Sequence, residues 1–145
     1  MGYRLVPAAP DMAAERADAQ ADRHSMKYEL SQEFYFEAAH TLSREVEADS
    51  SRRVHGHTYH AQISIEGPKD AHTGMVADLG HVRQIIENVR SELDHRLLDE
   101  VQDLGSPTLE NLCSLLWRRF HAALPALSRV TVSRRASGDA CTLTK

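Results

Sequence analysis

Three histidines carry the strongest chemical signal in the sequence. His55 and His57 flank Gly56, and His40 lies earlier in the chain. Two side chains that are two residues apart on an extended strand point to the same side. Three nitrogen ligands with an open fourth position are typical of catalytic zinc, whereas calcium and magnesium prefer oxygen ligands. The pattern predicts a zinc site at His40, His55 and His57. The alternative is that these are unrelated strand histidines.

Two predicted strands position these histidines. The first runs from Lys27 to His40, and its apolar side chains share the parity of His40, while polar side chains occupy the other parity. The second strand alternates through Tyr59, Ala61, Ile63 and Ile65 on the parity of His55 and His57. We expect a polar loop between them, from Thr41 to Arg53. If the two strands pair, the three imidazoles converge.

The rest of the chain predicts two amphipathic helices and two more strands. An apolar stripe runs from Leu79 to Leu93. A second helix is expected to begin with Ser106 as N-cap and Pro107 at the first helical position. Strands are expected around residues 130–133 and 141–143. The order of elements predicts an α+β fold with a mostly antiparallel sheet and helices on one face.

Composition narrows the class of protein. The 145 residues, with 41% apolar side chains, suit one domain with a core, and the net charge of −4 argues against nucleic-acid binding. No apolar run is long enough to span a membrane, and no secretory signal is recognisable. With only two cysteines, Cys113 and Cys141, we expect a cytoplasmic protein. Cys113 is expected in the core, and a catalytic role for Cys141 stays open.

The first 25 residues differ from the remainder. They are rich in Ala, Asp and Arg and hold few large apolar side chains. We interpret residues 1–25 as a polar extension and residues 26–145 as the domain. The alternative for the extension is a docking helix for a partner.

Five motifs in order resemble the 6-pyruvoyltetrahydropterin synthase and 6-carboxytetrahydropterin synthase family. They are Phe36-Glu37-Ala38-Ala39-His40, Val54-His55-Gly56-His57-Thr58-Tyr59, Gly74-Met75-Val76-Ala77-Asp78-Leu79, Leu93-Asp94-His95 and Pro107-Thr108-Leu109-Glu110-Asn111. The resemblance covers about residues 28–141. It implies the tunnelling fold (T-fold), with a four-stranded antiparallel sheet and two helices on one face. It also implies a homo-hexamer, a dimer of trimers with active sites between subunits.

The resemblance further implies a chemistry and residues to perform it. Family members act on 7,8-dihydroneopterin triphosphate with zinc as a Lewis acid, a cysteine as base and an Asp-His pair as proton relay. Asp94 and His95 match that pair, and the alternative is a helix-end aspartate beside a solvated histidine. Thr108 and Glu110 match residues near the pterin pocket, and the alternative for them is helix capping.

Two positions depart from the family pattern. Ser51 stands where the cysteine base is expected, and a serine hydroxyl is a much weaker base than a thiolate. Asp49 or Glu47 is a less direct candidate for the role of that base. Arg134 stands where a glutamate anchors the pterin ring, so an acceptor is replaced by a donor that suits carboxylate or phosphate. The alternative is that the match to the family is out of register at this strand. Arg134 is then a surface residue, and Glu110 serves as the anchor.

These departures leave three hypotheses about function. The first is a zinc-dependent lyase-type enzyme with an altered substrate or chemistry, acting on a pterin-like or anionic small molecule. The second is a genuine 6-carboxytetrahydropterin synthase with a replaced base. The third is a non-catalytic zinc or ligand-binding protein of the same fold.

Overall fold

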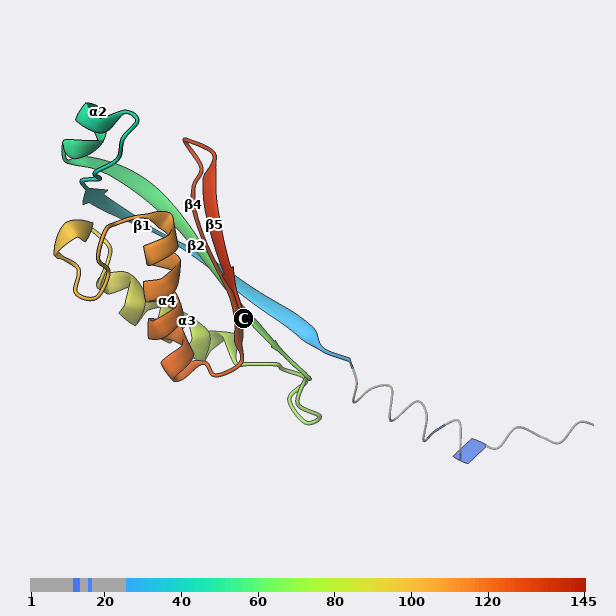
Figure 1. Ribbon diagram of the computed structural model, residues 1–145. Helices are drawn as coiled ribbons and strands as arrows, with labels where there is room; N and C mark the ends of the chain where they lie inside the picture. The colour runs from blue at the N-terminus through green and yellow to red at the C-terminus, as the bar shows by residue number, and fades with distance from the viewer. Residues whose placement is uncertain (1–11, 14–15, 17–25) are drawn as a thin grey trace, which may run out of the picture.

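Five strands form a single sheet in the order β3-β1-β2-β4-β5 (Figure 1). Four of them pair antiparallel: β1 (Tyr28–His40), β2 (His55–Gly67), β4 (Leu127–Arg134) and β5 (Asp139–Thr144). The fifth, β3 (Arg96–Leu97), adds two residues parallel to β1. The α+β class and the mostly antiparallel sheet are therefore confirmed, and the predicted count of four strands is one short.

The computed structural model describes residues 12–13, 16 and 26–145. The polar extension predicted for residues 1–25 falls almost wholly outside them, and the division at residue 26 stays a prediction. None of the helices in the described part of the chain combines the length and the apolar character that a membrane crossing needs.

The alternation of β1 and β2 decides which side chains face the core. On β1, Phe36, Ala38 and His40 are buried while Glu33 and Glu37 are exposed. Phe36 stacks on Tyr59 of β2, with ring centroids 5.1 Å apart. The predicted parity of both strands is confirmed, and it directs His40 to the inner, core-facing side of the sheet.

Two helices cover that inner side, as Figure 1 shows. α3 (Leu79–Ser91) begins where the Asp78 carboxylate accepts the Gly80 N–H at 2.7 Å, and it buries Val82, Ile86 and Val89. α4 (Leu109–Ala123) buries an apolar stripe that includes Cys113 and Phe120. Phe120 meets Phe34 of β1 edge to face at 5.8 Å. The placement of Cys113 in the core is confirmed.

The start of α4 differs from the prediction. Thr108, not Ser106, is the N-cap, because its hydroxyl accepts the Asn111 N–H at 3.2 Å. The Asn111 side chain donates back to the Ser106 carbonyl at 2.8 Å. Asn111 thus ties both residues to the first turn, and Pro107 lies before the helix rather than in it.

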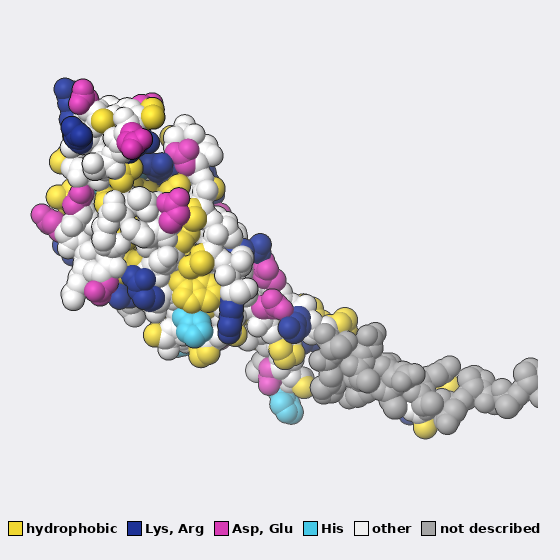
Figure 2. Space-filling view, in the orientation of Figure 1, with side chains coloured by type: hydrophobic (Ala, Val, Ile, Leu, Met, Phe, Trp, Pro, Cys, Tyr) yellow, Lys and Arg dark blue, Asp and Glu magenta, His cyan; other side chains and the backbone are white. Residues whose placement is uncertain are grey.

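Short elements lie in two segments outside the predicted helices and strands. The expected loop 41–53 includes α2 (Ala48–Arg52), and the polar segment after α3 contains β3 and a 3-10 turn, η1 (Leu98–Glu100). Neither shows a periodic apolar pattern, so contacts elsewhere in the fold stabilise them. β3 follows from the His95 N–H donating to the Glu37 carbonyl at 2.6 Å, beside β1. Around α2, acidic and basic side chains lie next to one another (Figure 2).

Candidate metal centre and relay

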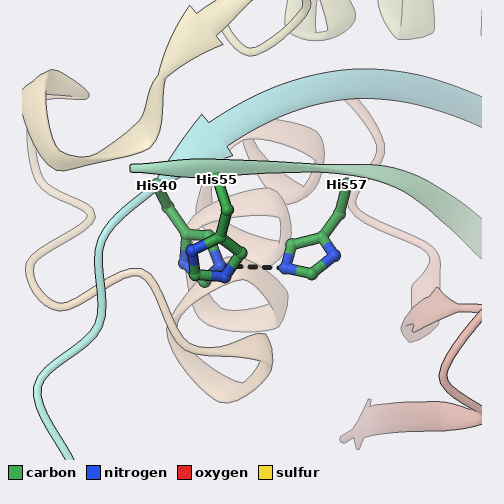
Figure 3. A group of neighbouring side chains, drawn as sticks. All are labelled: His40, His55 and His57. Carbon is green, nitrogen blue, oxygen red and sulfur yellow. Dashed lines mark hydrogen bonds between the residues drawn. The ribbon is translucent and has the colours of Figure 1, made fainter. Parts of the chain in front are cut away.

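The three histidines meet at one end of the sheet, on its inner face. The register pairs His40 with His55 and Ala38 with His57, so all three imidazoles project together from β1 and β2 (Figure 3). Just beyond His40, Thr41 donates its N–H and its hydroxyl to the Asp99 carboxylate of η1, at 2.9 and 2.5 Å. Asp99 thereby fixes the chain where it leaves β1.

The geometry of the triad suits a metal ion with nitrogen ligands. One ligand atom from each of His40, His55 and His57 lies within 4.8 Å of the others. The Nε2 atoms of His40 and His57 are 3.1 Å apart, close to the roughly 3.3 Å that two nitrogens span around tetrahedral zinc. His55 Nδ1 lies 2.8 Å from the Arg53 carbonyl, which orients the ring and leaves Nε2 free.

The surroundings favour the neutral state of His40 and His57, the state that binds metal. Burial lowers the pKa of His40, and the neighbouring His55 lowers it further. The pKa of His57 falls to about 4, chiefly because of burial and then because of the Arg134 guanidinium. His40 is only 1% exposed, and its Nδ1 atom has no hydrogen-bond partner among the described residues. Neutral nitrogens gathered this closely can hold a metal ion.

A cavity of about 270 Å³ opens beside the triad. Its lining joins His40 and Tyr59 to the three residues expected near the substrate, Thr108, Glu110 and Arg134. Cys141 also lines it. Burial raises the pKa of the nearby Cys113 thiol to about 12, so Cys113 supplies no thiolate. The cavity therefore brings the predicted substrate-binding residues to the metal-ligand side of the sheet.

Arg134 faces this cavity and reaches the triad. Its Nη1 atom lies 3.4 Å from His57 Nε2, and its Nη2 atom donates to Asp139 of β5 at 2.8 Å. Its side chain is only 19% exposed. The neighbouring Arg135 has the opposite parity and pairs with Glu33 on the outer face instead. The alternative in which Arg134 is a surface residue does not fit this arrangement.

Ser51 is occupied by a different partner. It lies in α2, is 3% exposed, and its hydroxyl accepts Arg44 Nε at 2.6 Å. Arg44 also pairs with Glu47 at 2.7 Å. No hydrogen bond among the described residues joins the Ser51 side chain to the histidines, Asp94 or His95. Glu47 is likewise held by Arg44, and Asp49 is exposed.

Asp94 and His95 lie together, but on the other side of the sheet. Asp94 Oδ2 is 3.0 Å from His95 Nδ1, and Asp94 Oδ1 accepts the Glu37 N–H at 2.9 Å. His95 Nε2 lies 3.9 Å from the Glu37 carboxylate, whose parity is outward. His95 borders an open hollow of about 550 Å³ whose lining also includes Gly56, His57 and Thr58. The His95 side chain thus lies near an outward-facing carboxylate, whereas the triad imidazoles have the inward parity of β1 and β2.

Four polar residues around these groups were not predicted. Arg90 donates to Asp94 at 2.8 Å and to the Tyr35 carbonyl at 2.8 Å. Its spacing of four residues from Asp94 on a helix is a usable signal. Arg44, Tyr59 and Asp139 had no comparable signal, because the contacts of Arg44 and Asp139 lie in a loop segment and across the β4–β5 pair rather than at helical spacing.

The comparisons with known proteins agree with this fold. The profile of the family described as 6-pyruvoyl tetrahydropterin synthase matches residues 29–145. The chain belongs to this family. A C. elegans 6-pyruvoyl tetrahydropterin synthase has the same fold, with a TM-score of 0.71 at 23% identity over 83% of this chain and 96% of that one. The T-fold inferred from the motifs is therefore confirmed.

Two relatives in the family carry different names. The dihydroneopterin monophosphate aldolase of Pyrococcus furiosus is 32% identical over 90 residues, covering 62% of this chain and 72% of that protein. The 6-carboxy-5,6,7,8-tetrahydropterin synthase of Bacillus subtilis is 28% identical over 111 residues, covering 72% and 73%. Membership of the family supports a lyase-like function in pterin biosynthesis.

Proposed function

We propose that this chain is a zinc-dependent lyase-type enzyme that acts on a pterin-like or anionic small molecule, with a substrate or chemistry altered from the synthases. One observation carries the proposal. The three histidines have the geometry of a metal site, while the family's base and anchor positions hold Ser51 and Arg134. The P. furiosus relative, which is named as an aldolase rather than a synthase, supports a family able to carry more than one reaction.

His40, His55 and His57 are the proposed ligands of the metal. Zinc bound there supplies a Lewis acid, which polarises substrate oxygens and acidifies neighbouring C–H bonds. The lowered pKa values of His40 and His57 support the proposal, because protons then compete poorly with the metal at neutral pH. Imidazole ligands favour zinc over calcium or magnesium.

Asp94 and His95 are the proposed proton relay. The 3.0 Å contact assigns a proton to His95 Nδ1, which donates to Asp94 and leaves the Nε2 lone pair to accept a proton from substrate. The pKa of Asp94 is lowered, first by the Glu37 N–H, so the carboxylate stays ionised. Ser51 is the proposed replacement for the cysteine, with Arg44 holding its hydroxyl.

The positions of the two halves support an active site shared between subunits. Because the His95 side chain lies near the outward-facing Glu37 and the triad has the inward parity, we propose that a relay from a second copy approaches the triad. The homo-hexamer expected from the family supplies such an arrangement, and the open edge strand β5 supports association of sheets. A cytoplasmic location, supported by two free cysteines, completes the proposal.

The first test is turnover of 7,8-dihydroneopterin triphosphate by zinc-loaded protein. We expect little or none of the synthase product, measured by chromatography beside a synthase of the family. Turnover equal to that synthase contradicts an altered function and favours the genuine 6-carboxytetrahydropterin synthase, the name carried by the B. subtilis relative.

A double variant measures how much the two departures matter. Ser51→Cys with Arg134→Glu restores both family residues, and we expect synthase activity to appear if only these positions diverged. If neither wild type nor any variant turns over a dihydroneopterin derivative while zinc and ligand still bind, the non-catalytic binding protein becomes the better description.

A further inference from the structure

The cavity beside the triad contains donors without acceptors. The Tyr59 hydroxyl and Arg134 Nε are buried and have no hydrogen-bond partner among the described residues. Both side chains line the cavity together with His40. An unpaired buried donor is costly, so a site that keeps two of them beside a cavity is suited to an acceptor ligand.

Arg134 has capacity to spare for such a ligand. A guanidinium carries five N–H donors. Asp139 takes one of them and His57 faces another, which leaves three. A metal ion on His57 Nε2 takes the lone pair that Nη1 faces, and so releases that donor as well. The free N–H groups then lie next to the metal-ligand atoms.

Charge selects the kind of acceptor. A guanidinium this close to a metal site places two cationic groups side by side, which repel one another unless an anion lies between them. Asp139 already offsets part of this charge, but its side chain is 46% exposed and it reaches only Nη2. A planar or tetrahedral oxyanion matches the geometry of a guanidinium fork.

We infer that Arg134 and Tyr59, with the metal held by His40, His55 and His57, bind one oxyanion of the substrate, a carboxylate or a phosphate. The inference rests on the proposed metal site and names the substrate class that the altered anchor accepts. In this arrangement the cavity binds an acidic substituent where a glutamate would bind ring N–H groups. Asp139 acts as an internal competitor that the substrate anion displaces from Arg134.

The test is calorimetric titration of zinc-loaded protein with inorganic phosphate and, separately, with acetate. We expect saturable binding of at least one of the two, and the tighter one assigns the oxyanion as phosphate or carboxylate. Arg134→Gln is expected to weaken this binding about 10–100-fold, as for a hydrogen bond to a charged group. Tyr59→Phe is expected to weaken it about 2–10-fold.

The chain offers a matched control and a variant of opposite sign. Arg135 and Glu33 form the equivalent pair on the outer face, one residue along the strand from Arg134. Arg135→Gln and Glu33→Gln should leave the anion affinity within about twofold. Asp139→Asn removes the competitor and should tighten binding, by more than Glu33→Gln does. Thermal melting of each variant separates loss of binding from loss of folding, and Arg134→Lys keeps the charge if Arg134→Gln melts early.

The outcomes separate this inference from the proposed function. Zinc content is measured on the same samples. If zinc is bound but Arg134→Gln and Arg134→Lys bind both anions as wild type does, the inference alone is wrong. It is also wrong if zinc-loaded wild type binds neither anion. A preparation that holds no zinc after loading and dialysis overturns the proposed function and the inference together.

Discussion

At the histidine end of the sheet, the two faces give histidine side chains different environments. On the inner face His40 is 1% exposed, and burial lowers the pKa values of His40 and His57. On the outer face the His95 side chain is 75% exposed, and its Nδ1 atom lies 3.0 Å from the Asp94 carboxylate. The buried histidines are the proposed metal ligands, and the exposed one belongs to the proposed relay.

This difference supports the proposal that one copy of the chain carries two separate halves of an active site, the histidine triad and the Asp94–His95 pair. A metal centre needs desolvated, neutral ligands, which the helices covering the inner face provide. A relay open to water exchanges protons with solvent, and only a covering surface turns it toward a substrate. In the proposed function, one protomer supplies all three metal ligands, and a second protomer supplies the relay.

The largest expected effect is on the metal. His57→Ala should reduce bound zinc from one per chain to almost none after dialysis, because losing a ligand costs more than the roughly 10–100-fold lost with an outer partner. Metal analysis of the dialysed protein measures it. His60→Ala is the control, since His60 lies on the same strand with outward parity, near Glu33. Equal zinc in both variants contradicts the triad.

The next effect is on turnover. His95→Ala should slow the reaction of whichever substrate wild type accepts by about 10²–10⁴-fold, the usual contribution of a general acid or base. Zinc content should stay unchanged, which separates the relay from the metal centre. His72→Ala, at an exposed turn, is the control. Full activity in His95→Ala removes His95 from the mechanism.

Mixing the two inactive variants tests whether the half-sites come from different subunits. In hexamers randomly reassembled from His57→Ala and His95→Ala chains, one site in four joins an intact triad to an intact relay. Activity should therefore recover to about a quarter of wild type, because independent sites follow this statistical mixing. Recovery is measured after unfolding and joint refolding. No recovery, with hexamers re-formed, indicates that each site lies within one chain.

A smaller effect is expected at Arg90. Arg90→Gln removes the 2.8 Å hydrogen bond to Asp94 and should lower turnover about tenfold, the value of a hydrogen bond between charged groups. The acidic limb of the pH–rate profile should move too, because the Asp94–His95 pair loses a neighbouring charge. Arg90→Lys should recover part of the loss, and Arg83→Gln on the exposed side of α3 should do nothing. If the pH–rate profile of Arg90→Gln does not move, the role of Arg90 is structural only.

The smallest effect is on stability against pH. The folded protein protonates His57 only near pH 4, whereas the unfolded chain does so near 6.5. Between these values the unfolded state holds more protons, so the free energy of unfolding of metal-free protein should fall as pH is lowered from about 6.5 to about 4. Urea unfolding with chelator present measures the slope. His57→Gln should flatten it, and an unchanged slope shows that His57 is not its source.

Much of the histidine triad and of the core-facing side of the sheet was predictable from the sequence. The period of two places His40, His55 and His57 on the apolar parity, and burial of that parity forces them inward. The helix stripes and the family motifs predicted the layers and the order of the elements. These are local properties, since each depends on side chains a few residues apart along one strand or helix.

Only the tertiary structure decided how distant groups pair. The sequence raised Arg134 as a departure, but the pairing of β4 with β2 and β5 places it between His57 and Asp139. The sequence shows that Asp94 and His95 are adjacent. Their position beside the outward-facing Glu37 follows from hydrogen bonds to the Glu37 backbone. The sequence placed Ser51 at the position of the cysteine base, and only the structure shows that its hydroxyl accepts a hydrogen bond from Arg44. The sequence determined which side of each element a residue occupies, and contacts between elements, which no local period encodes, decided what that residue touches.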